Sequence, residues 1–294
     1  MQFSVILVSY NASKDALEKT LRSILKQQGL SFEIIFADDG SLHYPKDDLI
    51  TLCRKYNFIN YKFSDNSENV GTVRNLIRAL ELTSGEFIKG IGAGDYFESK
   101  HLLRDVYHGM KSGNYFISYT KMNAYYVENN KEIVVPKKFP INNYLYRYEL
   151  TQLMKVNQIV YQDNISGATL FYERNVFLQY LSMVSGKVIY CEDLIQNLYT
   201  LDGYPTLYIE NQVIKYEYGM GISTSKEANK RFSKDFDAFQ QILSIRYPQN
   251  NLVQNRGLRS KVLRDGNALS KAIFVIENKP LITLSKFLIK SFRG

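Results

Sequence analysis

The chain has 294 residues, of which 45% are hydrophobic and 22% charged, a balance that excludes a disordered or fibrous protein. This length suits one large α/β domain with an appended part, or two smaller domains. The 37 Lys and Arg outnumber the 29 Asp and Glu, and the formal charge of +8 suits an anionic partner such as a nucleotide, a phospholipid surface or a nucleic acid. Cys53 and Cys191 have no partner motif, which excludes a disulfide framework and a four-ligand zinc site.

The N-terminus carries a short apolar run at 3–8, without a basic leader or a cleavage site of small residues. Such a run is too short for the apolar core of a secretory signal. We therefore expect a cytoplasmic protein, in keeping with the unpaired cysteines.

The first hundred residues alternate short apolar runs with helical periodicity, which is typical of strand-helix units that feed a mostly parallel sheet. A helix behind a Ser13 cap, a helix through 49–56 and a helix over 71–82 are predicted between the strands. The predicted strands are 3–8, 32–37, 61–63 and 87–91.

The pattern changes after Gly113. A strand at 115–119 and a polar turn at 128–131 precede a tyrosine-rich stretch without a clean period, which we interpret as an insertion. Further strands are predicted at 168–172, 207–209 and 213–218, with a helix through Leu194 and Leu198. The chain is expected to be helical from Lys226 onward, so we predict a main domain over 1–222 and a helical C-terminal extension over 223–294.

Polar segments follow four of the apolar runs, where a doubly wound sheet binds its ligand. Each segment alone could be a turn, and Asp-Gly-Ser has turn chemistry of its own. The segments are Ser9-Tyr10-Asn11, Asp38-Asp39-Gly40-Ser41, 69–75 and 92–95.

The ordered set of VSYN near residue 10, ADDGS at 37–41, ENVGTVRN at 68–75 and an acidic loop at 92–95 resembles glycosyltransferase family 2. The resemblance is close over about the first 100 residues and looser to about residue 225. It implies a GT-A fold, in which helices flank a Rossmann-like, mostly parallel sheet. It also implies a nucleoside-diphosphate-sugar donor, a divalent ion (Mn²⁺ or Mg²⁺), inversion at the anomeric carbon and a role in bacterial surface-polysaccharide biosynthesis.

A nucleotide site is expected at the first three motifs. Asp39 at a strand end can accept the imide N–H of uracil, and Arg74 can approach the base or the phosphates from the first helical turn. The alternative for Arg74 is a solvated surface arginine. A helix start near Gly71 favours anions. With UDP as the expected nucleotide, the predicted site comprises Val8, Tyr10, Asp39, Gly71 and Arg74.

The acidic loop departs from the two or three aspartates of the family, because it reads Gly92-Ala93-Gly94-Asp95. A divalent ion at such a site takes most of its oxygens from diphosphate and water, so Asp95 is the expected metal ligand. Gly94 would let the backbone approach the donor sugar closely. The alternative is a plain turn that has lost its metal site.

Glu192 and Asp193 resemble the family's Glu-Asp motif, whose second acid is usually taken as the base. An acceptor hydroxyl is a poor nucleophile, so a carboxylate within about 3 Å must take its proton. The resemblance therefore implies that Asp193 is the base, with Glu192 beside it. The alternative is two acids that stabilise a helix start.

The segment 216–223 looks like the mobile loop that follows the catalytic domain in this family. Tyr218 or Ser223 would donate to the diphosphate there, and a glycine-rich turn at a strand end is the alternative. Residues 280–294 predict a basic amphipathic helix, too short to cross a bilayer but suited to an anionic membrane surface and a lipid-linked acceptor. Packing on the core or on a second subunit is equally open, and with it a homo-oligomer.

Three rival functions are compatible with parts of the sequence. A weak metal site would leave a module that binds a nucleotide sugar without turning it over. The basic residues are dispersed and carry no nucleic-acid motif, so no nucleic-acid partner is expected. A nucleotidyltransferase normally has a glycine-rich, basic phosphate loop after its first strand, and VSYNAS is not such a loop.

Overall fold

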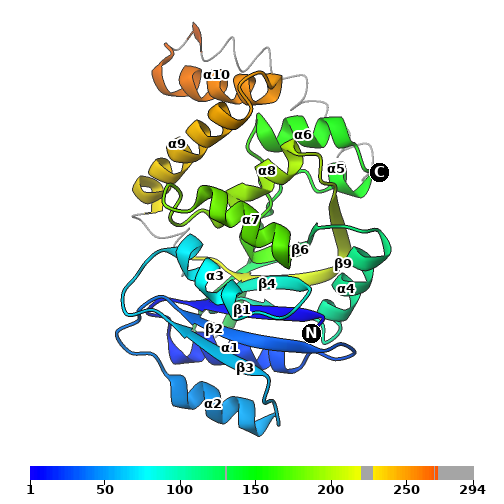
Figure 1. Cartoon of the computed structure of the whole chain (residues 1–294), viewed down its shortest axis with the longest axis vertical. Helices are drawn as coiled ribbons and strands as arrows, with labels where there is room; N and C mark the ends of the chain where they lie inside the picture. Colours follow the sequence, from blue (N-terminus) through cyan, green and yellow to red (C-terminus); the bar gives the residue numbers. More distant parts are fainter. Residues whose placement is uncertain (130, 220–227, 268, 271–294) are drawn as a thin grey trace. The chain divides into compact units, whose positions relative to one another are not determined.

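In the computed structural model, the described residues are 1–129, 131–219, 228–267, 269 and 270. They form two compact units, one of Met1–Phe139 and Ile165–Phe239 and one of Pro140–Asn164 with the described residues from Gln240 onward. Figure 1 shows the elements of both units. The predicted boundary at residue 222 lies outside the described residues.

The first half of the larger unit has the predicted alternation of strands and helices. Strand β1 pairs in parallel with β2 and β4, and β2 pairs in parallel with β3. The elements are β1 (Phe3–Ser9), α1 (Lys14–Leu25), β2 (Phe32–Asp38), α2 (Lys46–Lys55), β3 (Tyr61–Asp65), α3 (Thr72–Glu81) and β4 (Phe87–Gly92). The predicted Ser13 cap is confirmed, because Ser13 Oγ accepts the Ala16 N–H at 3.2 Å.

Helices cover both faces of this sheet. Helix α1 packs with α2, while α3 packs with α7 (Arg174–Val184), as Figure 1 illustrates. All seven residues of β2 are buried, as expected for a parallel strand between two helical layers. The core under α1 is formed by Leu17, Leu21 and Ile24 against alternate residues of β1 and β2. This packing fixes the carboxyl ends of β1, β2 and β4 at one edge.

The second half of the unit extends the sheet with strands of mixed direction, in the order β3-β2-β1-β4-β8-β6-β9-β5, with β7 beside β6. Here β8 is antiparallel to β4 and to β6, whereas β9 is parallel to β6. The elements are β5 (Tyr96–Phe97), α4 (Leu102–Ser112), β6 (Ile117–Glu128), β7 (Lys131–Val135), β8 (Leu170–Glu173), α8 (Gln196–Leu201) and β9 (Thr206–Glu217).

Two sequence expectations are corrected in this half. The strand expected at 115–119 runs from Ile117 to Glu128 and pairs with β7, so these two strands form a β-hairpin. Strand β6 ends and β7 begins at 128 and 131, where the polar turn was expected. The two strands expected at 207–209 and 213–218 are the single strand β9. Thr120 pairs with Ile209 while Lys121 pairs with Val213, so the polar residues 210–212, which resembled a turn, form an irregularity within one strand.

The smaller unit is helical and contains α5 (Tyr144–Arg147), α6 (Thr151–Ile159) and α10 (Asn251–Asp265). Arg256 is buried there and donates to Gln240 Oε1 and to the Ile159 carbonyl, both at 3.0 Å. Helix α9 (Ala228–Arg246) begins in the larger unit. With α10 it makes the described residues from 228 to 265 mostly helical, as expected. Within the described part of the chain, no helix is both long and apolar enough to cross a bilayer. The segment 280–294 lies outside that part.

Candidate functional site

Hydrogen bonds to Asp38 connect the DDGS turn to the end of β1. Its buried carboxylate accepts from Ser9 Oγ at 2.8 Å, from Ser41 Oγ at 2.6 Å and from the Ser41 N–H at 2.7 Å. The Val8 carbonyl accepts from the Ala93 N–H at 3.2 Å, which joins the end of β1 to the acidic loop. The first, second and fourth motifs of the sequence therefore meet at one edge of the sheet.

Asp39 holds the third motif at the same edge. Its Oδ1 accepts from the Val70 N–H at 2.9 Å and from Asn66 Nδ2 at 3.0 Å, and its Oδ2 accepts from the Gly71 N–H at 3.0 Å. A carboxylate has about four acceptor positions, so these three bonds leave room for one further donor. In this structure the side chain expected to bind the base also orders the loop before α3.

Ile189 packs against the first residues of α3. Gly71 has φ of +86°, and a Cβ at this position would collide with Ile189. The Val73 N–H donates to the Ile189 carbonyl at 3.0 Å, while the Gly71 N–H is used by Asp39. These two amides are therefore bonded within the chain. Arg74 is exposed and makes no ion pair within the described residues, so its guanidinium is available to a ligand.

Tyr10 is 43% exposed at the end of β1, beside Asn11. The Asn11 N–H donates to Ser41 Oγ at 2.7 Å, and Asn11 Oδ1 accepts from the Leu42 N–H at 3.0 Å. The backbone that carries Tyr10 is thus tied to the DDGS turn. The predicted nucleotide residues accordingly lie at the end of β1, in the turn after β2 and at the start of α3, which these hydrogen bonds connect.

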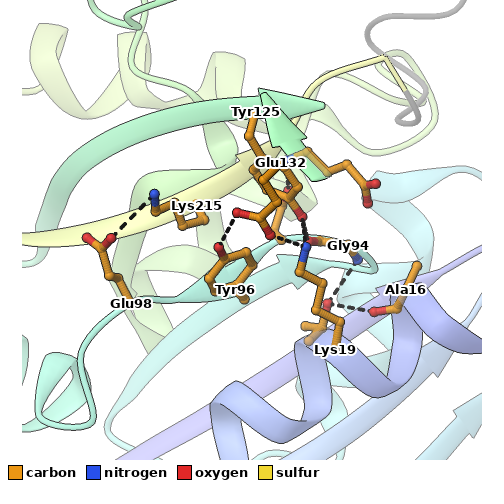
Figure 2. A network of polar contacts seen from close by, with 11 residues as sticks. Ala16, Lys19, Gly94, Tyr96, Glu98, Tyr125, Glu132 and Lys215 are labelled. Atoms are coloured by element: carbon orange, nitrogen blue, oxygen red, sulfur yellow. Dashed lines mark hydrogen bonds and ion pairs between the residues drawn. The ribbon is translucent and has the colours of Figure 1, made fainter. Parts of the chain in front are cut away.

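The acidic loop is held from two directions, as Figure 2 shows for the contacts around Gly94. The Gly94 N–H donates to Thr20 Oγ1 of α1 at 2.9 Å, and the Gly94 carbonyl accepts from the Tyr125 hydroxyl of β6 at 2.6 Å. The Lys19 ammonium donates to Tyr125 at 2.9 Å and to Glu132 of β7 at 2.6 Å. The β6–β7 hairpin, which was not predicted as a pair of strands, therefore holds the loop 92–95 in place through Tyr125, and through Glu132 by way of Lys19.

Asp95 is the buried end of this loop, with 6% of its surface exposed. Its Oδ1 accepts from the Glu217 N–H at 2.9 Å, and burial raises the pKa of Asp95 to about 7. Gly94 has φ of +101°, and a Cβ there would collide with the Glu217 carboxylate. The glycine does permit a close approach, but the group that uses it is the chain's own Glu217, which the sequence analysis missed.

Metal binding at this loop can use two carboxylates, Asp95 and Glu217. Within the ranges that the structure describes, no group of three or more His, Cys, Asp or Glu side chains could hold a metal ion. Mg²⁺ bound with substrate phosphates takes one or two protein carboxylates and several waters, so this donor set fits such an ion.

Glu192 and Asp193 lie in a 3₁₀ turn, Glu192–Ile195, which continues directly into α8, so both acids are in the first turn of a helical segment as expected. The Gly167 backbone lies beside Asp193 and lowers the pKa of its carboxyl, against the effect of burial. A Cβ at Gly167 would come within 2.7 Å of Glu192 Oε1, so this glycine lets the backbone approach the pair. Burial raises the pKa of both carboxyls, and the charge of Asp193 raises that of Glu192 further.

Lys89 is a buried basic residue that the sequence analysis overlooked. The acidic groups that act on its charge are Asp95 and Glu192. It lies in the middle of β4, and its ammonium donates to the carbonyls of Ala168 at 2.5 Å and Leu170 at 3.2 Å. Burial lowers the pKa of Lys89 to about 7, against the opposing effect of Asp95 and Glu192. A lysine within the apolar run FIKGIG was the available signal, because a charge on a fully buried strand needs partners.

Asp235 is a second overlooked residue, 2% exposed on α9. Its carboxylate accepts from three consecutive backbone amides, those of Ile189 at 3.1 Å, Tyr190 at 2.7 Å and Cys191 at 3.0 Å. The available signal was an acid at helical spacing from Phe239, on the buried face of a predicted helix.

The proposed diphosphate loop is described only in part. The Tyr218 N–H donates to the Tyr125 carbonyl at 2.6 Å, and the Lys137 ammonium lies 5.9 Å from the centre of the Tyr218 ring. Ser223 lies outside the described residues. Its predicted contact with the diphosphate stays a prediction.

The model of the family described as "Glycosyl transferase family 2" matches residues 4–176, which is more than half of the chain. The chain belongs to this family. No curated protein sequence matches it.

Solved structures with a similar fold include fragments comprising residues 1–349 of TarS from S. aureus. The fragment in complex with UDP-GlcNAc is 17% identical with a TM-score of 0.60, covering 97% of this chain and 79% of that one. The fragment in complex with UDP is 17% identical with a TM-score of 0.57, covering 90% and 73%. These likenesses confirm the GT-A fold that the motifs implied.

Proposed function

We propose that this chain is an inverting glycosyltransferase that takes a sugar from a nucleoside-diphosphate donor, with UDP as the nucleotide. The observation that carries the proposal is the segment 189–193. Ile189 closes the start of α3 beside the Asp39 loop, and Glu192 and Asp193 follow on the same stretch of backbone. The UDP and UDP-GlcNAc complexes of the TarS fragments support a UDP-sugar donor.

In the proposed reaction, Asp193 takes the proton of an acceptor hydroxyl as its oxygen attacks the anomeric carbon. The bond to the diphosphate oxygen breaks in the same displacement, so the configuration inverts and no covalent intermediate forms. A base works best when its pKa lies near the working pH, and burial moves Asp193 in that direction. The nucleotide would be bound by Val8, Tyr10, Asp39, Gly71 and Arg74.

A divalent ion, Mn²⁺ or Mg²⁺, would be held by Asp95 and Glu217, and when bound it neutralises charge on the departing diphosphate. The Lys19 and Tyr125 contacts keep the loop that carries Asp95 in place. Tyr218, which follows Glu217, and Ser223 would donate to the diphosphate.

The acceptor we propose is a growing glycan, lipid-linked or protein-linked, in polysaccharide biosynthesis. Residues 280–294 would hold the protein at the inner face of the cell membrane if their leucines enter the headgroup region. The enzyme would then be a cytoplasmic, peripheral membrane protein.

UDP release from a panel of UDP-sugars, with Mn²⁺ or with EDTA, tests the proposal. The wild-type chain should release UDP with a suitable acceptor, and EDTA should suppress the release. Asp193→Asn should lower turnover by about 10²–10⁴-fold while UDP binding persists. Glu81→Gln, an exposed acid at the end of α3, is the matched control. An Asp193→Asn protein that keeps most of its turnover would remove Asp193 from the role of base.

A second candidate is a module that binds a nucleotide sugar without transferring it. The observation in its favour is the loop 92–95, which keeps one aspartate where the family has two or three. Binding of UDP-sugar by calorimetry without any release of UDP, with or without metal, would support the binding module over the enzyme.

A further inference from the structure

The turn 189–191, which precedes Glu192 and Asp193, is hydrogen-bonded to the buried side chain of Asp235. Three successive N–H groups, at residues 189, 190 and 191, converge on the two oxygens of Asp235. Consecutive amides that point to one place form an anion-binding concavity, and hydrogen bonds to a carboxylate are about twice as strong as neutral ones. Asp235 is therefore the anion that this turn binds.

The turn 189–191 is connected to the proposed nucleotide site at its start and to the carboxylate pair at its end. At its start, the Ile189 carbonyl accepts from Val73 in the first turn of α3. At its end, the 3₁₀ turn of Glu192 and Asp193 begins directly after Cys191. A shift of the turn would therefore move the proposed base relative to the nucleotide side of the site.

We propose that Asp235 is a positioning residue, which fixes the turn 189–191 and thereby the place of Glu192 and Asp193. The inference rests on the proposed function, because it takes Asp193 as the base. It assigns a role in the reaction to a residue beyond 222, in the segment that the sequence identified as an extension.

The charge of Asp235 also acts on Glu192, the neighbour of the proposed base. Glu192 faces Asp193 in its own turn, Lys89 from β4, Tyr172 from β8 and Asp235 from α9. The negative charge of Asp235 raises the pKa of Glu192, while the positive charge of Lys89 lowers it. Removing the charge at 235 should therefore move the acid limb of the kcat–pH profile to lower pH. Greater exposure of the pair would move it in the same direction, so a variant that only loosens the packing of α9 must leave the limb in place.

Asp235→Asn is the sharpest test, because it keeps the size of the side chain and removes the charge and one acceptor oxygen. Asp237→Asn removes the same charge from an exposed position of the same helix and serves as the charge control. Phe239→Leu reduces packing on the buried face of α9, keeps the Asp235 carboxylate, and serves as the stability control. Each variant is assayed for UDP release, UDP affinity, melting temperature and hydrogen exchange of the amides 189–191.

We expect Asp235→Asn to lower kcat by about 10–100-fold, since a displacement of about 1 Å can cost about 100-fold. UDP affinity should stay within about threefold, the acid limb should move to lower pH, and the amides 189–191 should exchange faster. Both controls should keep kcat within about twofold, even where Phe239→Leu lowers the melting temperature as much as Asp235→Asn does.

If the wild-type chain is active and Asp235→Asn keeps its kcat and its pH profile, the assignment of Asp235 is overturned while the proposed function stands. A wild-type chain that releases no UDP from any donor would overturn the proposed function. Hydrogen exchange then decides on Asp235 alone: amides 189–191 that remain as protected in Asp235→Asn as in the wild type would overturn the positioning role as well.

Discussion

The carboxylate of Glu217 lies against the backbone of Gly94, in the space that a Cβ at position 94 would occupy. Asp95, the next residue, accepts a hydrogen bond from the Glu217 N–H at 2.9 Å. The end of β9 and the acidic loop therefore support each other. The Glu217 carboxylate needs the space left by Gly94, and Asp95 needs the hydrogen bond from the Glu217 N–H.

This contact makes Gly94→Ala a test of the loop. The methyl group must displace Glu217, and φ of +101° is unfavourable for alanine, at about 1–3 kcal/mol. We expect turnover to fall by at least tenfold and the metal dependence to shift to higher Mn²⁺ concentration. Gly203→Ala is the matched control, because φ is +92° there and nothing lies within 4 Å of the added methyl group. Equal turnover in the two variants would contradict the role given to the Glu217 contact.

Lys89 gives a prediction on stability and pH. Its pKa falls from 10.5 in the unfolded chain to about 7 in the folded protein. Between these values the unfolded chain binds one more proton, so this group makes the folded state more stable as pH rises from about 7 to 10.5. The difference in unfolding free energy between the wild type and Lys89→Met should thus grow in favour of the wild type over this window. Denaturant titrations at pH 7 and pH 9.5 measure it, and a constant difference would show that Lys89 keeps its proton when the protein folds.

The same substitution should act on the carboxylate pair in the opposite sense to Asp235→Asn. Lys89 lowers the pKa of Glu192, so its removal should move the acid limb of the kcat–pH profile to higher pH. Lys89→Arg should keep the charge and most of the profile if it folds. Shifts of the same sign in Lys89→Met and Asp235→Asn would mean that one of the two charges does not act on Glu192 as we infer.

Substitution of Arg74 tests whether this residue contacts the nucleotide or only contributes to the fold. It is exposed, so Arg74→Ala should change the unfolding free energy by no more than about 0.5 kcal/mol. If its guanidinium binds the base or the phosphates, UDP affinity should nevertheless fall by about tenfold or more, as for a lost charge-assisted hydrogen bond. Arg54→Ala, at an exposed position of α2, should leave UDP affinity unchanged. Identical affinities for the two variants would identify Arg74 as a surface arginine.

The sequence predicted the first half of the fold well because its signals are local. Buried parallel strands appear as apolar runs, and Ser13 caps its helix with its own hydroxyl, so strands β1 to β4 and the first three helices could be placed within a few residues. The motifs at their carboxyl ends could be assigned to one edge for the same reason.

The parts that were missed depend on contacts between residues distant in sequence. Strand β6 continues past 119 because β7 and β9 pair with it, which its tyrosine-rich sequence does not reveal. Glu217 approaches Gly94 only once β9 has entered the sheet. Asp235 can be recognised only when the turn 189–191 is seen around it, because an acid within a helix is ordinarily a solvated one.

The bond between Asp235 and the turn 189–191 also has a consequence for the order of events during synthesis. Asp235 follows Cys191 by 44 residues, which a ribosome adding about 5–20 residues per second takes about 2–9 s to make. The strands β1 to β4 can meet before that time, but the carboxylate pair then lacks the group that holds its turn. We therefore expect the turn that carries the carboxylate pair to become ordered last in the sheet domain, after α9 has been made.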